Sequence, residues 1–484
     1  MKSSSHGAMT LRPKSEDKPS RNSPSITPVS PFKFCLAFFS IDMACSHVGK
    51  KRSPAEESLS DRVVRTNNSA PTACSTRLTA ALAVAVRIFR WVAAAVMFLN
   101  SATFITTFKS SSNMIFKNHL IMFLILCCLS KFNQEYDENI TQKEKRMMKA
   151  IGYTHSLDIN EPNALIDLDV DKPSASGRDL LVKINAIAVN PVDYKIRQRV
   201  NPEGGDPKIL GWDAVGEVAE IGADVTQFAV GDKVYYAGDL TRAGSNAEFQ
   251  LVDERIVGKA PSSLSDSEAA ALPLTTITAY ELLFDHLALK QQSEKSDEVV
   301  LVVGAAGGVG SIMLQLLKVL TGAVVIATAS RESSKNWVQE LGADYVVDHS
   351  KPLAEQIKSL NIGEVTHVAS LNNTHQYIDE YVEVMKPKGK LALIDDPESL
   401  DVAKLKQKSL SLHWEFMFTR SMFETEDMVE QSRLLTHVAT LIDEGKIKTT
   451  VGKHLGKITA QNLIAAHRIL EEGRAIGKLV LEGF

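Results

Sequence analysis

Cysteine is absent from this 484-residue chain after residue 147. All five cysteines lie before that point, at Cys35, Cys45, Cys74, Cys127 and Cys128. Their absence excludes a disulfide framework and thiolate metal ligands in the rest of the chain, and it is typical of a reducing compartment. We therefore predict a cytoplasmic location for the body of the protein.

Paired histidines are lacking as well. The nine histidines after residue 147 are scattered, and none forms an H-x-x-x-H pair. Zinc sites draw their ligands from thiolates, imidazoles and carboxylates that lie close together. The sequence therefore predicts no metal site, and each histidine is better interpreted as a surface or hydrogen-bonded residue.

Glycine and acidic residues are scarce in the first 147 residues and common afterwards. The first part has 2 of the 27 glycines, and its 20 Lys and Arg outnumber 10 Asp and Glu. The rest has 34 Lys and Arg against 48 Asp and Glu, so the chain consists of two unlike parts. Because the second part is acidic and has no basic footprint for nucleic acid, we expect a small-molecule substrate.

A clear membrane span is also missing. Residues 78–108 are apolar, but Arg87 and Arg90 lie in their middle, where a charge is costly in a bilayer. Residues 120–129 number only ten, and a helix needs roughly 20 residues to cross. We predict no stable membrane insertion for residues 148–484.

Residues 1–147 are interpreted as a poorly ordered N-terminal extension. Residues 1–30 are rich in Ser, Pro and Lys, a composition typical of disorder. Met147 and Met148 are followed directly by the first strand pattern, as at a natural start. Two interpretations stay open: the extension is not native and comes from misassigned initiation, or it targets or anchors the protein.

The body is organised around a glycine-rich stretch. An apolar strand pattern over 299–303 runs into Gly304, Gly307, Gly308, Val309 and Gly310, and residues 311–320 continue with helical spacing. Such spacing lets the backbone turn tightly and approach a pyrophosphate, whose charge the helix N-terminus favours. We predict that these five residues bind a dinucleotide; a tight turn without a ligand is the alternative.

Strand and helix patterns alternate around this loop. Further strands are expected at 324–329, 345–348, 365–371 and 390–394, each after a helix-like segment. This alternation predicts an α/β fold with a doubly wound parallel Rossmann sheet.

From residue 149 onward, short strands such as 180–189 and 215–221 predict a β-rich lobe. One helix is expected over 265–287, and the C-terminal part should contain a strand at 410–418, helices at 428–444 and 460–472, and a strand at 477–481.

The residues after the second sheet strand favour NADPH over NADH. An NAD site places an acidic residue there for the ribose 2′-hydroxyl, whereas a 2′-phosphate needs basic or polar contacts. Ser330 can donate a hydrogen bond and Arg331 can pair with a phosphate, with His349 as a weaker neighbour. Glu332 complicates this interpretation, although it also suits the start of the next helix.

Several motifs occur in a fixed order and together resemble one protein family. They are Asn190-Pro191-Val192-Asp193, Gly211-Trp212-Asp213-Ala214-Val215-Gly216, Gly231-Asp232-Lys233-Val234, Leu272-Pro273-Leu274-Thr275, Thr278-Ala279-Tyr280, Ala306-Gly307-Gly308-Val309-Gly310, Leu341-Gly342-Ala343-Asp344 and Gly477-Lys478. From about residue 148 to 484 the chain resembles the medium-chain dehydrogenase/reductase superfamily. Within it, the chain is most similar to the quinone oxidoreductase branch and to zinc-type alcohol dehydrogenase-like proteins.

This resemblance implies a domain plan. We expect a GroES-like catalytic lobe over 148–271, a Rossmann NADP-binding domain over 272–408, and a C-terminal segment over 409–484 that completes the sheet and returns to the lobe. Substrate and nicotinamide would lie in the cleft between lobe and Rossmann domain. The resemblance also implies a homodimer joined through the cofactor domains.

The chain departs from the zinc enzymes of this family at the metal ligands. Zinc alcohol dehydrogenases use a cysteine in the first motif, Gly-His-Glu in the second and a further cysteine near the interdomain helix. Here the corresponding places hold Asn190, Trp212 with Asp213, and a position near Pro273. The body has no thiolate at all, so the resemblance implies a zinc-free member.

A zinc-free member must stabilise negative charge by hydrogen bonding, which suits quinones and α,β-unsaturated carbonyls because conjugation spreads the charge. The resemblance assigns Asn190 to the nicotinamide or substrate oxygen, Tyr194 as a candidate acid, and Thr278 and Lys478 to the cofactor. Aromatic residues are expected in an apolar pocket, or alternatively in the core or a dimer interface: Trp212, Trp414, Phe416 and Phe418. The rival functions are a zinc-type alcohol dehydrogenase and a non-catalytic NADPH-binding protein.

Overall fold

The computed structural model describes residues 147–484 except residues 205 and 293. The predictions for residues 1–146, including the poorly ordered extension and its two interpretations, lie outside the described residues. Among the residues that are described, no helix is both long and apolar enough to cross a membrane.

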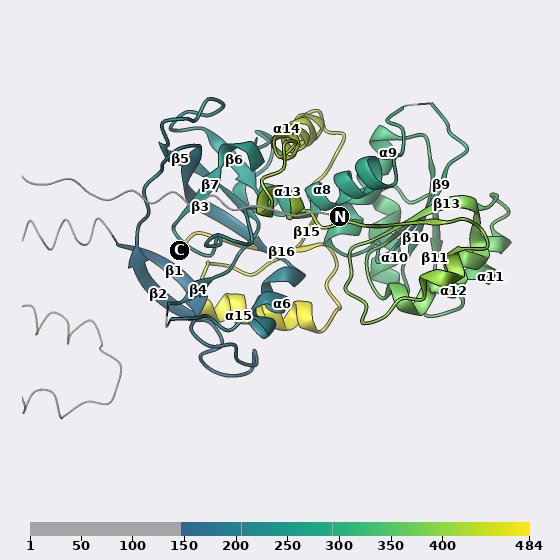
Figure 1. The fold of residues 1–484 in the computed structure, drawn as a ribbon, viewed down its shortest axis with the longest axis horizontal. Helices are drawn as coiled ribbons and strands as arrows, with labels where there is room; N and C mark the ends of the chain where they lie inside the picture. The colour runs from purple at the N-terminus through teal and green to yellow at the C-terminus, as the bar shows by residue number, and fades with distance from the viewer. Residues whose placement is uncertain (1–146, 205, 293) are drawn as a thin grey trace, which may run out of the picture. The chain divides into compact units, whose positions relative to one another are not determined.

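One sheet has six strands, all paired in parallel, in the order β11-β10-β9-β12-β13-β14 (Figure 1). Its strands are β9 (Val299–Val303), β10 (Val324–Thr328), β11 (Tyr345–Val347), β12 (Val365–Ser370), β13 (Met385–Leu393) and β14 (Ser411–Trp414). They are connected by α9 (Gly308–Leu320), α10 (Glu332–Glu340), α11 (Leu353–Ser359), α12 (Thr374–Val384) and the short η4 (Val402–Leu405). β9 and β12 are buried along their whole length, as expected for a parallel sheet covered on both faces. The predicted doubly wound sheet is confirmed.

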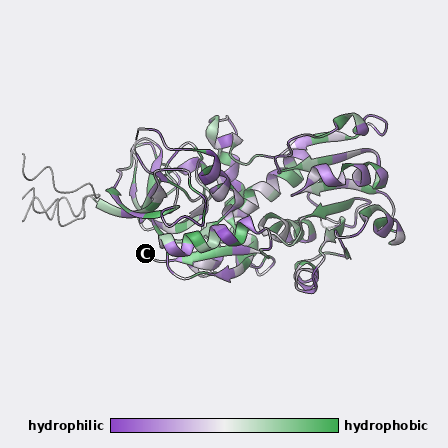
Figure 2. Cartoon of the chain, turned by 90° about the horizontal axis from the view of Figure 1, so that it is seen from below, coloured by the Kyte–Doolittle hydropathy of each residue, from purple (hydrophilic) through white to green (hydrophobic). Residues whose placement is uncertain are grey.

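The second sheet belongs to a β-rich lobe. It has seven strands in the order β15-β16-β3-β5-β6-β8, with β7 paired to β3. These are β3 (Asp179–Val189), β5 (Ala214–Ile221), β6 (Lys233–Tyr236), β7 (Phe249–Asp253), β8 (Val257–Lys259), β15 (Val451–His454) and β16 (Lys478–Glu482). The lobe also contains a small sheet of β2 (Ile166–Asp171), β1 (Met147–Tyr153) and β4 (Lys208–Ile209), the helices α6 (Pro191–Arg199) and α15 (Ala460–Glu471), and η2 (Glu254–Ile256). Figure 2 shows apolar stretches along the strands of the sheets, where the core lies.

The C-terminal part contributes to both sheets. β14 pairs with β13 at the edge of the parallel sheet, and β16 pairs antiparallel with β3, placing Leu479 opposite Val189. Between them lie α13 (Thr419–Met422) and α14 (Val429–Asp443). This connectivity suits the plan of a segment that returns to the lobe, while the exact domain boundaries stay a prediction.

The single helix expected over 265–287 is wrong. The structure has three pieces instead: α7 (Asp266–Ala270), α8 (Pro273–Tyr280) and the π-helical η3 (Glu281–His286). Pro273 lacks an N–H and cannot continue α7, so it starts α8 instead. The start is as expected, because Ser265 caps α7 and forms a capping box with Glu268. The strand expected at 410–418 is also shorter, since β14 ends at Trp414.

Candidate functional site

The glycine-rich loop between β9 and α9 has the backbone geometry of a close approach. Gly304 has a φ of +82°, a left-handed conformation that side chains rarely adopt. A Cβ at Gly310 would lie 2.4 Å from the carbonyl oxygen of Ala305, so only glycine lets the helix pack so tightly. α9 begins at Gly308, and its first N–H groups and positive dipole end are free of intrahelical partners. Together Gly304, Gly307, Gly308, Val309 and Gly310 fit the pyrophosphate of a dinucleotide.

Three predicted selectivity residues come together beyond the end of β10. The Ser330 hydroxyl and His349 Nε2 lie 3.1 Å apart. The exposed Arg331 donates one N–H to the carbonyl oxygen of Arg474 at 3.2 Å. Burial lowers the pKa of His349, Asp348 opposes this shift and the Arg331 charge adds to it. These groups offer hydroxyl, guanidinium and imidazole contacts at the strand end where a 2′-phosphate would lie.

Asn190, Asp213 and Lys478 form a buried polar cluster, which we call the Asn190 cluster. Asn190 Nδ2 donates to Asp213 Oδ2 at 2.7 Å, and Lys478 Nζ forms an ion pair with the same oxygen at 2.9 Å. Lys478 also donates to Asn190 Oδ1 and to the carbonyl oxygen of Val189. The Leu274 N–H at the start of α8 donates to Asp213 Oδ1 at 2.7 Å. The cluster is therefore held together by four separate chain segments, those of Asn190, Asp213, Leu274 and Lys478.

Burial perturbs the carboxyl group of Asp213 and that of Asp193, which accepts the backbone N–H of Asn190. Burial raises the pKa of Asp193 to about 7, against the opposing effects of the Asn190 N–H and the Lys478 charge. Burial likewise raises the pKa of Asp213, and the nearby Lys478 ammonium works against that shift. An uncompensated carboxylate would be costly here, so Lys478 is the group that makes an ionised Asp213 tolerable.

The Asn190 cluster touches the glycine loop directly. Gly477 bridges to Gly307 and donates its N–H to the carbonyl oxygen of Ala306 at 2.9 Å. A Cβ at Gly308 would lie 2.7 Å from Cδ of Lys478. The predicted cofactor loop and the predicted catalytic Asn190 are thus linked through two consecutive residues, Gly477 and Lys478.

The residues at the family's zinc position do not fit a zinc ion. Asn190 offers an amide and Trp212 an indole, and the one carboxylate, Asp213, is already paired with the Lys478 ammonium. An ammonium at 2.9 Å from the carboxylate would repel a divalent cation at the same place. Among the residues that the structure describes, no group of three or more His, Cys, Asp or Glu could hold a metal.

We expect protein purified without added metal to contain no stoichiometric zinc and to keep its activity in chelator, because Lys478 already supplies a positive charge there. Elemental analysis of the full chain checks this. One zinc per chain that is lost in chelator together with activity would contradict the expectation.

The other predicted residues lie on the two helices beside this cluster. Tyr194 is half-buried on α6, four residues after Asn190. Thr278 is buried on α8 and donates its hydroxyl hydrogen to the carbonyl oxygen of Leu274 at 2.9 Å.

The four aromatic residues do not share one environment. The buried Trp212 and Phe418 rings pack edge to face at 6.3 Å, whereas Trp414 and Phe416 are 55% and 49% exposed.

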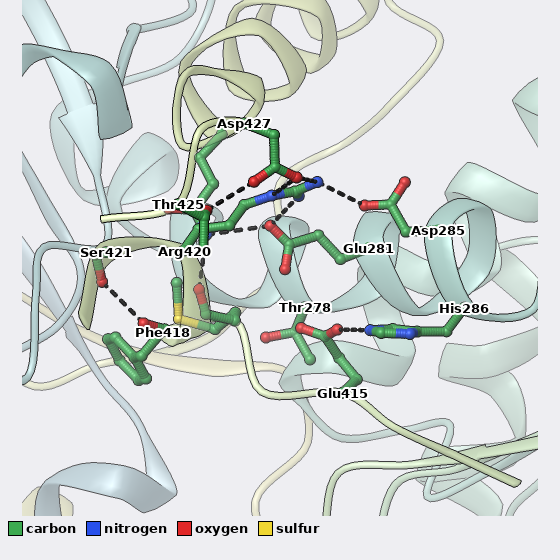
Figure 3. Close-up of polar contacts among 12 residues, drawn as sticks. Thr278, Glu281, Asp285, His286, Glu415, Phe418, Arg420, Ser421, Thr425 and Asp427 are labelled. Carbon is green, nitrogen blue, oxygen red and sulfur yellow. Dashed lines mark hydrogen bonds and ion pairs between the residues drawn. The ribbon is translucent and has the colours of Figure 1, made fainter. Parts of the chain in front are cut away.

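A second polar cluster was missed at the sequence level. Glu281, Glu415 and Arg420 converge beside α8, with His286, Asp285 and Asp427 around them (Figure 3). The residues come from η3 and from the chain after β14, and Arg420 lies 139 positions from Glu281 and 135 from Asp285. The signal in the sequence was an isolated acid within each of two apolar stretches, for which only a helix over 265–287 and a strand at 410–418 were predicted.

Comparison with known proteins identifies the family. Two family profiles match, the alcohol dehydrogenase GroES-like domain over residues 176–262 and zinc-binding dehydrogenase over residues 341–481. A zinc-type alcohol dehydrogenase-like protein of Staphylococcus epidermidis is 40% identical over 336 residues, which cover 69% of this chain and 99% of the relative. The chain belongs to the medium-chain dehydrogenase/reductase superfamily. Members of this superfamily are oxidoreductases that use NAD(P)H, and the resemblance inferred from the motifs is confirmed.

Other related proteins have names that refer to different activities. A solved structure from Rhizobium etli, described as a zinc-dependent alcohol dehydrogenase, has 47% identity and a TM-score of 0.68, covering 70% of this chain and 99% of that chain. The tomato 2-methylene-furan-3-one reductase (Solanum lycopersicum) is 29% identical over 346 residues, 69% of this chain and 79% of the relative. Quinone oxidoreductases are among the solved structures that share the fold. The expected combination of a Rossmann sheet with a GroES-like lobe is therefore confirmed.

Proposed function

We propose that this oxidoreductase uses NADPH to reduce quinones or α,β-unsaturated carbonyl compounds without a catalytic zinc ion. The observation that carries the proposal is the Asn190 cluster, in which Lys478 and Asp213 form a closed ion pair where a metal would otherwise be bound. Oxidation of a simple alcohol needs its hydroxyl to be deprotonated, and without a metal this place offers no evident means of lowering the pKa of the hydroxyl. A conjugated acceptor needs only an oriented hydride and a hydrogen-bond donor at its oxygen.

The cofactor would be held by the residues of the glycine loop and of the end of β10. Gly304, Gly307, Gly308, Val309 and Gly310 would surround the pyrophosphate, and Ser330, Arg331 and His349 would contact the 2′-phosphate; Thr278 and Lys478 would border the nicotinamide end. When bound, the reduced nicotinamide supplies a hydride. The protein residues would hold the cofactor and the acceptor in position in the cleft, and one of them would donate a hydrogen bond to the acceptor oxygen.

Asn190 is the proposed donor of that hydrogen bond. One of its amide hydrogens is committed to Asp213 at 2.7 Å, whereas the contact with the carbonyl oxygen of Trp212 is long, 3.4 Å. The weakly bonded hydrogen is the one available to an acceptor. Lys478 and Asp213 fix the amide plane from either side, so the donor is oriented before the reaction. Tyr194, on the helix that follows Asn190, is one candidate acid.

Asn190→Ala is expected to lower kcat with a quinone or an alkenal while NADPH affinity stays within a few-fold, because the contact is used mainly in the transition state. Asn185→Ala, on the same strand β3, removes an amide that bonds Asp266 and is the matched control. Steady-state kinetics with a quinone, an alkenal, ethanol and a longer alcohol tests both the role of Asn190 and the type of reaction. Alcohol oxidation faster than reduction of every conjugated acceptor would overturn the proposal.

Two other functions would give different results. A zinc-type alcohol dehydrogenase would contain stoichiometric metal and oxidise alcohols. The Staphylococcus relative is named a zinc-type alcohol dehydrogenase-like protein. A non-catalytic NADPH-binding protein would bind the cofactor without turning over any acceptor. The cytoplasmic location and the homodimer belong to the same proposal and can be tested by fractionation and by light scattering.

A further inference from the structure

Two buried carboxyl groups meet beside α8, outside the Asn190 cluster. Glu281 begins η3 and is 5% exposed, and Glu415 follows β14 and is 3% exposed. Glu281 Oε1 accepts from Arg420 Nη1 at 2.6 Å and from Gln431 Nε2 at 3.1 Å (Figure 3). Burial, and after it the charge of Glu415, raises the pKa of Glu281, so each carboxyl group lies within the electrostatic reach of the other.

Negative charge exceeds positive charge around this pair. Arg420 also bonds Asp285 at 3.1 Å and Asp427 at 2.8 Å, so one guanidinium serves three carboxylates before Glu415 is considered. Asp285 and Asp427 are about half exposed and are solvated, whereas Glu281 and Glu415 are not. Two adjacent buried carboxylates that share so little positive charge cannot both stay ionised without a large cost.

Hydrogen bonding points to the same conclusion. Among donors in the described residues, none reaches Glu415 Oε1, although that atom is buried. Ionised carboxylates have no hydrogen to give, so a proton on one of the pair supplies the missing donor. Burial raises the pKa of Glu281 and of Glu415 to about 8 each, with Arg420 opposing both shifts. A proton is therefore retained by the pair at neutral pH.

The pair is connected to solvent on one side. His286 Nε2 lies 2.7 Å from Glu415 Oε2, and the His286 side chain is 34% exposed. The ring of His413 on β14 lies 6.1 Å from the ring of His286. His413 is the other titratable residue that faces the path between Glu415 and solvent. His286 can thus pass a proton between water and Glu415.

On its other side the pair borders the proposed active site. Glu281 follows Leu274, whose N–H holds Asp213, by seven residues, or about 10 Å of helix rise. Thr278 lies between them, one turn before Glu281 and on the same helix face. Phe418, three residues after Glu415, packs on Trp212, and Gln431 joins Glu281 to the carbonyl oxygen of Met417.

We propose that Glu281 and Glu415 hold one proton between them, and that this proton, replenished through His286, is the one consumed when the acceptor is reduced. The inference rests on the proposed function and adds its proton source. Reduction adds a hydride to the β-carbon of an enone, and the electron pair of the C=C bond moves to give an enolate. The enolate takes a proton, which the pair releases by way of water or of the Thr278 hydroxyl after that hydroxyl has turned away from the Leu274 carbonyl oxygen. His286 then returns a proton from solvent. The two glutamates act through these carriers and position the proton; they do not touch the acceptor.

Glu415→Gln in the full chain tests the proposal, because it removes the proton store but leaves the Arg420 ion pair with Glu281. Asp285→Asn removes an exposed partner of Arg420 and is the matched control. We expect kcat with an enone to fall about tenfold or more in Glu415→Gln, within the range of proton-transfer catalysis, with NADPH affinity unchanged. The solvent deuterium isotope effect should rise, and the effect of deuterated NADPH should shrink, because proton delivery becomes slower than hydride transfer.

The pH profile and infrared spectra give two further readouts. Because the pair loses its proton through about pH 8, wild-type kcat should fall above that pH, and Glu415→Gln should lack this limb. Subtracting the infrared spectrum of Glu415→Gln from that of the wild type at pH 7 cancels the carboxyl group of Asp193 and should leave the carbonyl stretch of a protonated carboxylic acid, which fades above about pH 8.

Each result decides one step. Without this infrared band, the shared proton is refuted. If the band is present but Glu415→Gln has the same kcat and the same two isotope effects as Asp285→Asn, the use of the proton in the reaction is refuted. A wild-type protein that reduces no conjugated acceptor refutes the proposed function and with it the use of the proton, whereas the band still decides whether the pair holds one.

Discussion

A Lys478→Met variant is expected to lose roughly 3 to 5 kcal/mol of folding free energy, because it leaves the buried Asp213 carboxylate without its ammonium partner. The ion pair has a 2.9 Å contact, and both side chains are at most 3% exposed. Such a loss is a large share of the stability of an ordinary domain. Chemical denaturation of wild type and variant at the same pH measures it.

The double variant Lys478→Met with Asp213→Asn separates charge from shape. It removes both charges and keeps an oxygen for the Leu274 N–H, so most of the lost stability should return. If Lys478 also orients Asn190 for the reaction, kcat stays low in the double variant although the fold has recovered. A double variant with no more stability than Lys478→Met would show that the charge of Asp213 is not the cause.

The stability loss should depend on pH in a defined direction. Burial raises the pKa of Asp213, so the folded variant keeps a proton that the unfolded chain releases. The deficit of Lys478→Met therefore grows as the pH rises above the unfolded pKa of about 3.9 and is larger at pH 8 than at pH 6. Lys195→Met is the control, because its contact with Asp396 is solvent-exposed and should change stability by less than about 1 kcal/mol.

Arg331→Ala is expected to weaken NADPH binding by roughly tenfold or more and to leave NADH binding nearly unchanged. A charge-assisted contact with the 2′-phosphate is worth about 1.5 to 3 kcal/mol, and NADH has no such phosphate. Arg331 uses one N–H on the carbonyl oxygen of Arg474, which leaves further donors of the guanidinium for an anion. Titration of each cofactor by fluorescence or calorimetry measures the two affinities.

Lys335→Ala is the matched control for Arg331→Ala, since it removes the same charge one helical turn further along α10. It should change the two cofactor affinities by similar small factors, through long-range charge alone. Equal losses of NADPH and NADH binding in Arg331→Ala would mean that this residue does not select the phosphate, and Ser330 and His349 would then be the remaining candidates.

The Rossmann half of the fold and the place of its loop could be predicted from local sequence patterns. The strand expected at 324–329 is β10 (Val324–Thr328), and the helix expected after the glycines is α9. These features follow from local rules, since a buried parallel strand needs a continuous apolar run and a tight strand-to-helix turn needs glycine. Where a local rule was overlooked, as at Pro273 within the helix expected over 265–287, the prediction failed.

The grouping of the polar residues could not be predicted from the sequence, because it depends on how distant segments pack together. Lys478 reaches Asn190, 288 positions earlier, because β16 pairs with β3 in a register that places Leu479 opposite Val189. Arg420 reaches Glu281 and His286 reaches Glu415 because η3 packs against the chain that leaves β14. Strand register and chain reversal are set by the whole core, and a buried charge pair between distant segments leaves no period or spacing in the sequence.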